Sequence, residues 1–107
     1  MKKNELIITV ESDENHLPER ITWRTSGDSN EKKARSIMMA VWDEEEMNTL
    51  RVDLWLKNMS VEEMKIFFHQ NLVSTVETYR RATGDHPTCD ELITYLQELG
   101  KKMGVLK

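Results

Sequence analysis

The stretch that decides the fold is Asn48-Thr49-Leu50-Arg51-Val52-Asp53-Leu54-Trp55-Leu56-Lys57. Every second position in it is apolar, from Leu50 to Leu56, whereas Arg51, Asp53 and Trp55 fill alternate positions. Successive side chains of a β-strand point to opposite faces, while a helix repeats every 3.6 residues. The pattern therefore predicts a strand with one leucine-rich face and a second face that carries a tryptophan and two charges.

Three segments before this strand also alternate. Residues 4–11 and 20–25 flank a short polar turn and predict a hairpin. Residues 34–43 are apolar on both faces, which is typical of a strand inside a sheet, although the Met and Ala residues leave a helix as the alternative. We favour the strand, because the acidic run 43–46 follows it as a hairpin tip and another strand comes next. Residues 26–30 are small and polar and predict a loop.

The second half of the chain has helical spacing. Ser60 and Glu63 form a capping-box pattern before a helix that Gly84 can end. Thr88 and Glu91 repeat the pattern after Pro87, and a second helix follows. We expect the end of this helix to fray, because Gly100 and Gly104 weaken it.

These elements predict an α+β fold. We expect an antiparallel four-stranded sheet followed by two C-terminal helices packed on one face, which Leu50, Val52, Leu54 and Leu56 should meet. The 107 residues suit one domain over 1–107, with strands over about 4–57 and helices over about 60–104.

Composition excludes several classes of partner. The net charge of −4 argues against nucleic acid, because phosphate binding needs a cationic surface. No apolar run approaches the ~18 residues of a membrane span, so we expect no direct membrane insertion. The N-terminus lacks the long apolar segment of a signal peptide, and the one cysteine cannot form an internal disulfide. We therefore expect a cytoplasmic protein.

Residues that often carry chemistry are scattered. His86 and Cys89 stand three apart, but a structural zinc site needs four ligands and there is no second cysteine. The same spacing is a weak basis for a cysteine nucleophile, and His69 is expected to be a packed helix residue. The four glycines form no phosphate loop. The sequence predicts no enzyme, no cofactor and no metal.

One predicted surface stands out as a protein-binding candidate. It comprises Met38 and Trp42 on the strand over 34–43 and Arg51, Asp53 and Trp55 on the next strand. An exposed apolar area rimmed by charge marks an interaction surface, and Trp and Arg are enriched among residues that dominate interfaces. The alternative is that the N-terminal hairpin or a loop of the same chain covers this face.

Five segments stand in a distinctive order and spacing: Leu17-Pro18-Glu19-Arg20-Ile21-Thr22-Trp23, Ile37-Met38-Met39-Ala40-Val41-Trp42-Asp43, Leu50-Arg51-Val52-Asp53-Leu54-Trp55, Met64-Lys65-Ile66-Phe67-Phe68-His69-Gln70 and Arg81-Ala82-Thr83-Gly84-Asp85. In these segments the chain resembles the gliding motility-associated protein GldC family, up to about Asp85. The resemblance implies a cytoplasmic accessory component of bacterial gliding motility, associated with a membrane-bound machinery and without catalytic activity or cofactor. It brings no site residues with it.

The leading expectation is thus a non-enzymatic adaptor that binds a protein partner. The resemblance points to a membrane-associated motility complex as the source of that partner. One alternative is a homo-oligomeric structural module whose sheets pair through the same face. The other is a small-ligand or enzymatic site that uses His69 and Asp53 and needs a cavity with convergent polar groups.

Overall fold

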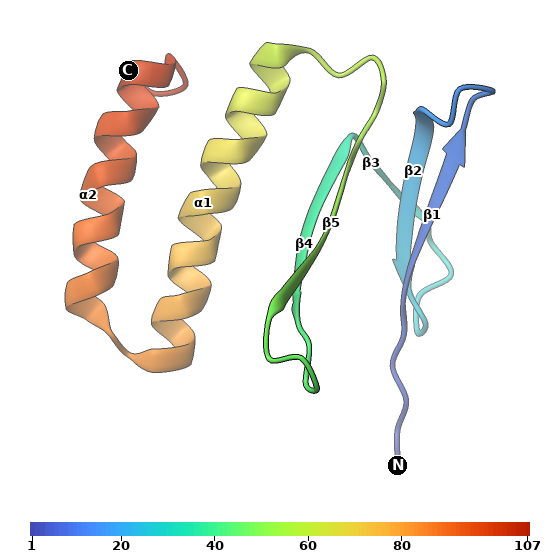
Figure 1. Cartoon of the computed structure of the whole chain (residues 1–107), viewed down its shortest axis with the longest axis horizontal. Helices are drawn as coiled ribbons and strands as arrows, with labels where there is room; N and C mark the ends of the chain where they lie inside the picture. The colour runs from blue at the N-terminus through green and yellow to red at the C-terminus, as the bar shows by residue number, and fades with distance from the viewer. The chain divides into compact units, whose positions relative to one another are not determined.

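The computed structural model describes residues 1–107, which divide into two compact units. Residues 1–59 hold all the strands, and residues 60–107 hold both helices (Figure 1). The α+β class, with antiparallel strands followed by two C-terminal helices, is confirmed. That the chain forms one domain, with its helices on one face of a sheet, stays a prediction.

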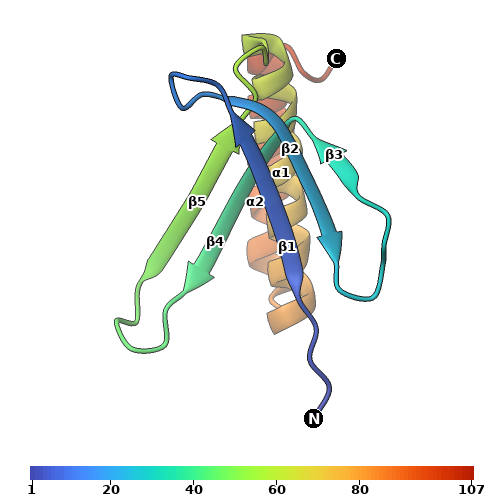
Figure 2. The same cartoon turned by 90° about the vertical axis from the view of Figure 1, so that its right-hand side faces the viewer.

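The strands form two sheets, so the predicted single four-stranded sheet is wrong. The first sheet has the order β1-β2-β3 and the second consists of β4 and β5 (Figure 2). Both are antiparallel. Their bounds are β1 Leu6–Ser12, β2 Pro18–Thr25, β3 Lys32–Ala34, β4 Ser36–Trp42 and β5 Thr49–Trp55.

The predicted strand over 34–43 passes from one sheet to the other at Arg35. Before this residue, β3 pairs with β2, and after it, β4 pairs with β5. Continuing the β2–β3 register would place Arg35 opposite Arg20, and like charges directly opposite one another destabilise a sheet. It would also bring Ile37 opposite Pro18, which has no N–H to donate. The Arg35 carbonyl instead accepts from the N–H of Leu56, at 2.9 Å.

The first sheet buries the middle of β2. β2 is the central strand of this sheet, and in it Ile21 is 1% exposed and Thr22 is also buried. The turn between β1 and β2 is held by Asp13, whose Oδ1 accepts from the N–H groups of Asn15 and Leu17 at 2.8 and 3.0 Å. Such an Asx turn is a common way for an aspartate to order a short polar loop.

The first helix begins and ends as predicted. α1 spans Val61–Thr83, and Ser60 and Glu63 exchange both hydrogen bonds of a capping box, each 3.1 Å long. Gly84 follows in the left-handed conformation, φ 71°, and its N–H donates to the Arg80 carbonyl. This is the position that favours glycine, because it lacks a Cβ.

The second helix begins earlier than predicted. α2 spans His86–Met103, and its N-cap is Asp85, whose Oδ1 accepts from the N–H of Thr88 at 3.3 Å. The predicted capping box of Thr88 and Glu91 is therefore wrong. Pro87 lies in the first turn, where a helix does not need the N–H that proline lacks.

The helical hairpin has its own small core. Val76 of α1 packs with Cys89 and Leu96 of α2, and the half-buried side chains of Leu72, Val73 and Ile93 surround them. Neither helix combines the length and apolar character that crossing a membrane requires.

The end of α2 does not fray as predicted. Gly104 adopts a left-handed conformation, φ 78°, and the N–H groups of Val105 and Leu106 return to the Gly100 carbonyl at 2.9 and 3.1 Å. Gly100 itself is buried beside the His69 ring, whose Nε2–H donates to the Leu96 carbonyl at 2.7 Å. The absence of a side chain at Gly100 thus makes room for both the histidine and the folded-back tail.

Gly100→Ala is expected to lower the free energy of unfolding by about 1–3 kcal/mol, the usual cost of overpacking. A Cβ at this position would lie 2.8 Å from His69 Nε2 and 2.5 Å from Leu106 Cδ1. Helix propensity alone would change stability in the opposite direction, by about 1 kcal/mol. Urea denaturation measures the sign. Gly27→Ala is the control, because a Cβ there meets no atom within 4 Å. A Gly100→Ala protein more stable than the parent would contradict this packing.

Candidate functional site

The β4–β5 register places the predicted binding residues on one face. Met38 lies opposite Asp53, and Trp42 and Trp55 lie opposite Thr49 and Ser36. Residues directly opposite in an antiparallel pair share a face, and so do residues two apart in one strand. The prediction that the five residues share a face is therefore confirmed. We call this set the tryptophan face: Met38, Trp42, Arg51, Asp53 and Trp55.

Both indoles of the tryptophan face are exposed. Trp42 is 62% and Trp55 is 52% exposed, although each is a large apolar side chain. They end β4 and β5, so they lie at opposite ends of the hairpin. The register separates them by about 20 Å along the strands, at about 3.3 Å for each residue. The face therefore presents two aromatic contact points with other side chains between them.

An ion pair occupies the middle of the face. Arg51 Nε and Nη2 donate to Asp53 Oδ2 and Oδ1 at 3.0 and 2.9 Å, a bidentate contact along one strand. Hydrogen bonding to Asp53, reinforced by its charge, raises the pKa of Arg51 above its ordinary value. The two charges neutralise each other, so the centre of the face is polar but carries no net charge.

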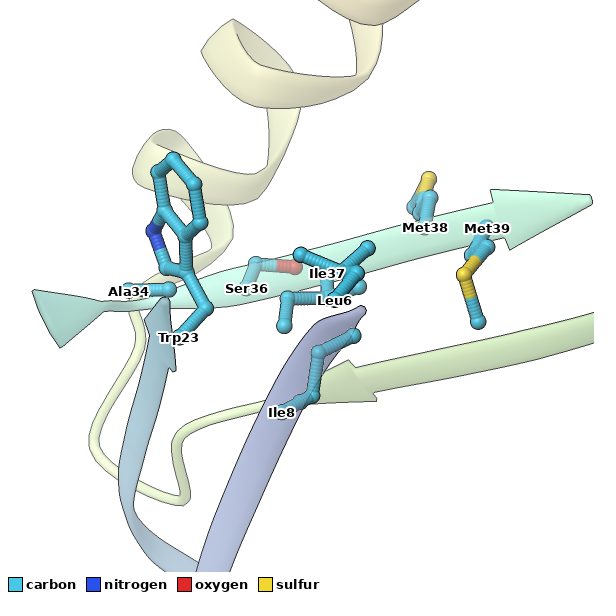
Figure 3. Close-up of a pocket in the computed structure, with 8 residues that line it drawn as sticks. All are labelled: Leu6, Ile8, Trp23, Ala34, Ser36, Ile37, Met38 and Met39. Atoms are coloured by element: carbon cyan, nitrogen blue, oxygen red, sulfur yellow. The ribbon is translucent and has the colours of Figure 1, made fainter. Parts of the chain in front are cut away.

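Met38 differs from the other members of the face because it is half-buried. It borders a pocket of about 330 Å³ whose lining is almost entirely apolar (Figure 3). In that view Met38 and Met39 point to opposite sides of β4. The lining residues are Leu6, Ile8, Trp23, Ala34, Ser36, Ile37, Met38 and Met39. None of them is ionisable, so the pocket suits an apolar side chain rather than acid–base chemistry.

A second, smaller hollow adjoins Trp55. It measures about 170 Å³ and is lined by Leu17, Pro18, Asp53, Leu54, Trp55 and Lys57. The β1–β2 turn thus borders one end of the tryptophan face but leaves the indole half exposed. The alternative that the N-terminal hairpin seals this face within the chain does not describe the structure.

Lys57 makes the contact that holds this end of the hairpin, and no local sequence pattern predicts it. Its Nζ lies 3.0 Å from Asp13 Oδ2 and 2.9 Å from Glu19 Oε1, and its N–H donates to the Pro18 carbonyl. Hydrogen bonds from Lys57 to Glu19 and Asp13 raise the pKa of the lysine. The partners are 44 and 38 positions away, beyond the range of any local pattern.

The histidines and the cysteine have other partners. Cys89 is fully buried, and its Sγ donates to the Val76 carbonyl at 3.6 Å. His86 Nδ1 accepts from the Arg80 guanidinium at 3.0 Å, while His69 is buried against the Leu96 carbonyl. His86 and Cys89 are therefore engaged separately. No three side chains of the His, Cys, Asp and Glu types gather in a cluster that could hold a metal ion.

The comparison with family models shows the family to which the chain belongs. The model described as "Gliding motility-associated protein GldC-like" matches residues 18–105, so the chain belongs to the GldC-like family. No curated protein and no solved structure matches. The match continues beyond Asp85 through the second helix, where the resemblance was expected to end. It includes both strands of the hairpin that carries the tryptophan face.

Asp13→Asn is expected to lower the free energy of unfolding more at neutral than at acidic pH. Hydrogen bonds from the Leu17 N–H and from Lys57 lower the pKa of Asp13 below its ordinary value of 3.8. A depressed folded-state pKa contributes stability above the unfolded-state value, and this contribution is lost as the pH falls through the folded value. Urea denaturation at pH 7 and at about pH 2 measures the difference.

Glu14→Gln is the control for Asp13→Asn, because Glu14 lies in the same turn and is exposed. It should change stability little at either pH. An equal loss for Asp13→Asn at both pH values would show that its carboxylate charge does not support the turn.

Proposed function

We propose that this protein is a cytoplasmic, non-enzymatic accessory protein of the gliding motility machinery, and that it binds a partner protein through the tryptophan face. Membership of the GldC-like family supports the process. We propose in addition that it acts as an adaptor, that its partner belongs to a membrane-associated motility complex, and that it works in the cytoplasm.

The exposure of Trp42 and Trp55 is the observation that carries the proposal. Leaving two indoles in water is unfavourable, and burying each removes a large apolar area from solvent. Tryptophan is also among the residues that contribute most to binding at interfaces. A partner that contacts both ends of the hairpin would gain from two anchors held at a fixed separation by one β-ladder.

The charges of the face indicate the kind of surface it fits. Arg51 and Asp53 neutralise each other, although the whole chain carries a net charge of −4. A strongly basic or acidic partner would gain little from this neutral centre. The complementary surface is a protein with apolar recesses for the indoles and hydrogen-bonding groups between them.

The groups that chemistry would require already have structural roles. His69 and Cys89 are buried and bond backbone carbonyls, and Asp53 pairs with Arg51. These roles support a binding protein over the alternative ligand site at His69 and Asp53. A buried cysteine without a disulfide supports a reducing compartment such as the cytoplasm.

Replacing Trp42 and Trp55 together by alanine should abolish partner binding and leave the fold intact. Each indole is more than half exposed, so its loss removes little internal packing. Losing two interface anchors typically costs about 2 kcal/mol or more each, roughly a thousandfold in affinity when both are lost. The measurement is capture of partners by the purified chain, paired with restoration of gliding in cells that lack the protein.

Tyr95→Ala is the matched control, because Tyr95 is an aromatic residue of the helical unit with 62% exposure. It should retain both activities. If the double tryptophan variant captured the same partners and restored gliding like the parent, the tryptophan face would not be the binding surface.

A further inference from the structure

β4 and β5 are both edge strands of a two-stranded sheet, and neither has the bulge, lysine or proline that protects the other strand edges; of the two, only β5 carries charged side chains. β1 is interrupted by a register shift at Glu11 and Ser12, and β3 is only three residues long and begins with two lysines. β5 has seven residues in unbroken register with β4 and contains neither proline nor lysine. Proteins normally protect an exposed edge with bulges, short strands, lysine or proline, because an open edge invites pairing with another chain.

The hydrogen-bond pattern shows which groups of β5 face outward. The N–H of Leu56 donates to the Arg35 carbonyl, and the N–H of Asp43 donates to the Asn48 carbonyl, both at 2.9 Å. Hydrogen-bonded and non-hydrogen-bonded pairs alternate in an antiparallel ladder. The backbone N–H and C=O groups of the even-numbered residues of β5 therefore point toward β4. The backbone groups of Thr49, Arg51, Asp53 and Trp55 therefore point to the outer edge. The backbone N–H of Lys57, another odd-numbered residue, also points away from β4 and donates to the Pro18 carbonyl.

The order of side chains along this edge is self-complementary. We propose that β5 pairs antiparallel with β5 of a second copy, in the register centred on Val52. Arg51 then lies opposite Asp53 of the second copy, Leu50 opposite Leu54, and Val52 opposite Val52. The residues whose backbone groups point outward then form hydrogen-bonded pairs between the copies, Arg51 with Asp53 and Thr49 with Trp55, as antiparallel geometry requires.

The charges favour this register over the registers shifted by one or two residues. A slip by two residues in one direction sets Arg51 opposite Arg51, and a slip in the other direction sets Asp53 opposite Asp53. Like charges directly opposite destabilise a sheet, whereas opposite charges stabilise it. A slip by one residue would place outward-facing groups against inward-facing ones and would exchange the two faces. The centred register is therefore the one that satisfies both hydrogen bonds and charges.

This pairing also changes the tryptophan face, although it stands independently of the proposed function. Trp42 lies beside Thr49 across the β4–β5 ladder, and Thr49 would lie beside Trp55 of the second copy. Two indoles from different copies would then be about 10 Å apart, two strand spacings, rather than about 20 Å along one hairpin. The dimer would carry two such composite aromatic patches.

The first test exchanges charges. The parent protein should be dimeric by light scattering at about 100 µM, well above the dissociation constants of typical specific complexes. Arg51→Asp and Asp53→Arg should each raise the dissociation constant about tenfold or more, because like charges then meet twice across the edge. An equimolar mixture of these two variants should dimerise again, since each aspartate of one chain meets an arginine of the other.

The mixture separates pairing between copies from the ion pair within one chain. Neither variant has an oppositely charged residue at positions 51 and 53 of its own strand, so recovery on mixing requires contact between the chains. A parent protein that is monomeric at this concentration, or variants that stay monomeric when mixed, would overturn the proposal.

The second test uses disulfide formation. In a Cys89→Ser background, Val52→Cys should form a covalent dimer under mild oxidation, because the Cα atoms of a non-hydrogen-bonded pair lie about 4.5 Å apart and within disulfide range. Leu50→Cys is the control, since its counterpart faces Leu54 instead. Cross-linking of Leu50→Cys as readily as Val52→Cys would contradict the register. Neither test depends on a motility partner, so failure of the proposed function leaves both results unchanged.

Discussion

The antiparallel ladder between β4 and β5 is the constraint on which the rest of the account depends. It has no bulge over seven residue pairs, so alternate side chains of both strands lie on opposite faces of the hairpin. One face gathers Ile37, Met39, Val41, Leu50, Val52 and Leu54, and the other is the tryptophan face. A slip of one residue in either strand would exchange the faces of that strand.

Local features of the chain were predictable because their causes lie within a few residues. The two-residue period defined β5, the exchange between Ser60 and Glu63 fixed the start of α1, and Gly84 supplied the left-handed residue at its end. The five members of the tryptophan face could be grouped for the same reason. Their relation required only the period of each strand and the pairing of two neighbouring strands.

Features with distant causes were not predictable. The change of sheet at Arg35 reflects what Arg20 and Pro18 would place opposite it in the first sheet. The contact of Lys57 with Asp13 and Glu19 joins segments that no sequence window contains. The start of α2 was mispredicted for a local reason, since Asp85 and Thr88 are both good N-caps and the structure uses Asp85, with Pro87 in the first turn. The tail packs because Gly100 has room for Leu106, which composition alone does not reveal.

The register of the hairpin can be measured most directly by NMR. The pairs Met38–Asp53 and Ala40–Arg51 are non-hydrogen-bonded, and the Cα atoms of such pairs lie about 4.5 Å apart, with their Hα atoms facing each other. Strong Hα–Hα nuclear Overhauser effects are expected for both pairs. Contacts displaced by one residue, such as Met38 with Val52, would contradict this register, because Trp42 would then no longer share a face with Arg51, Asp53 and Trp55.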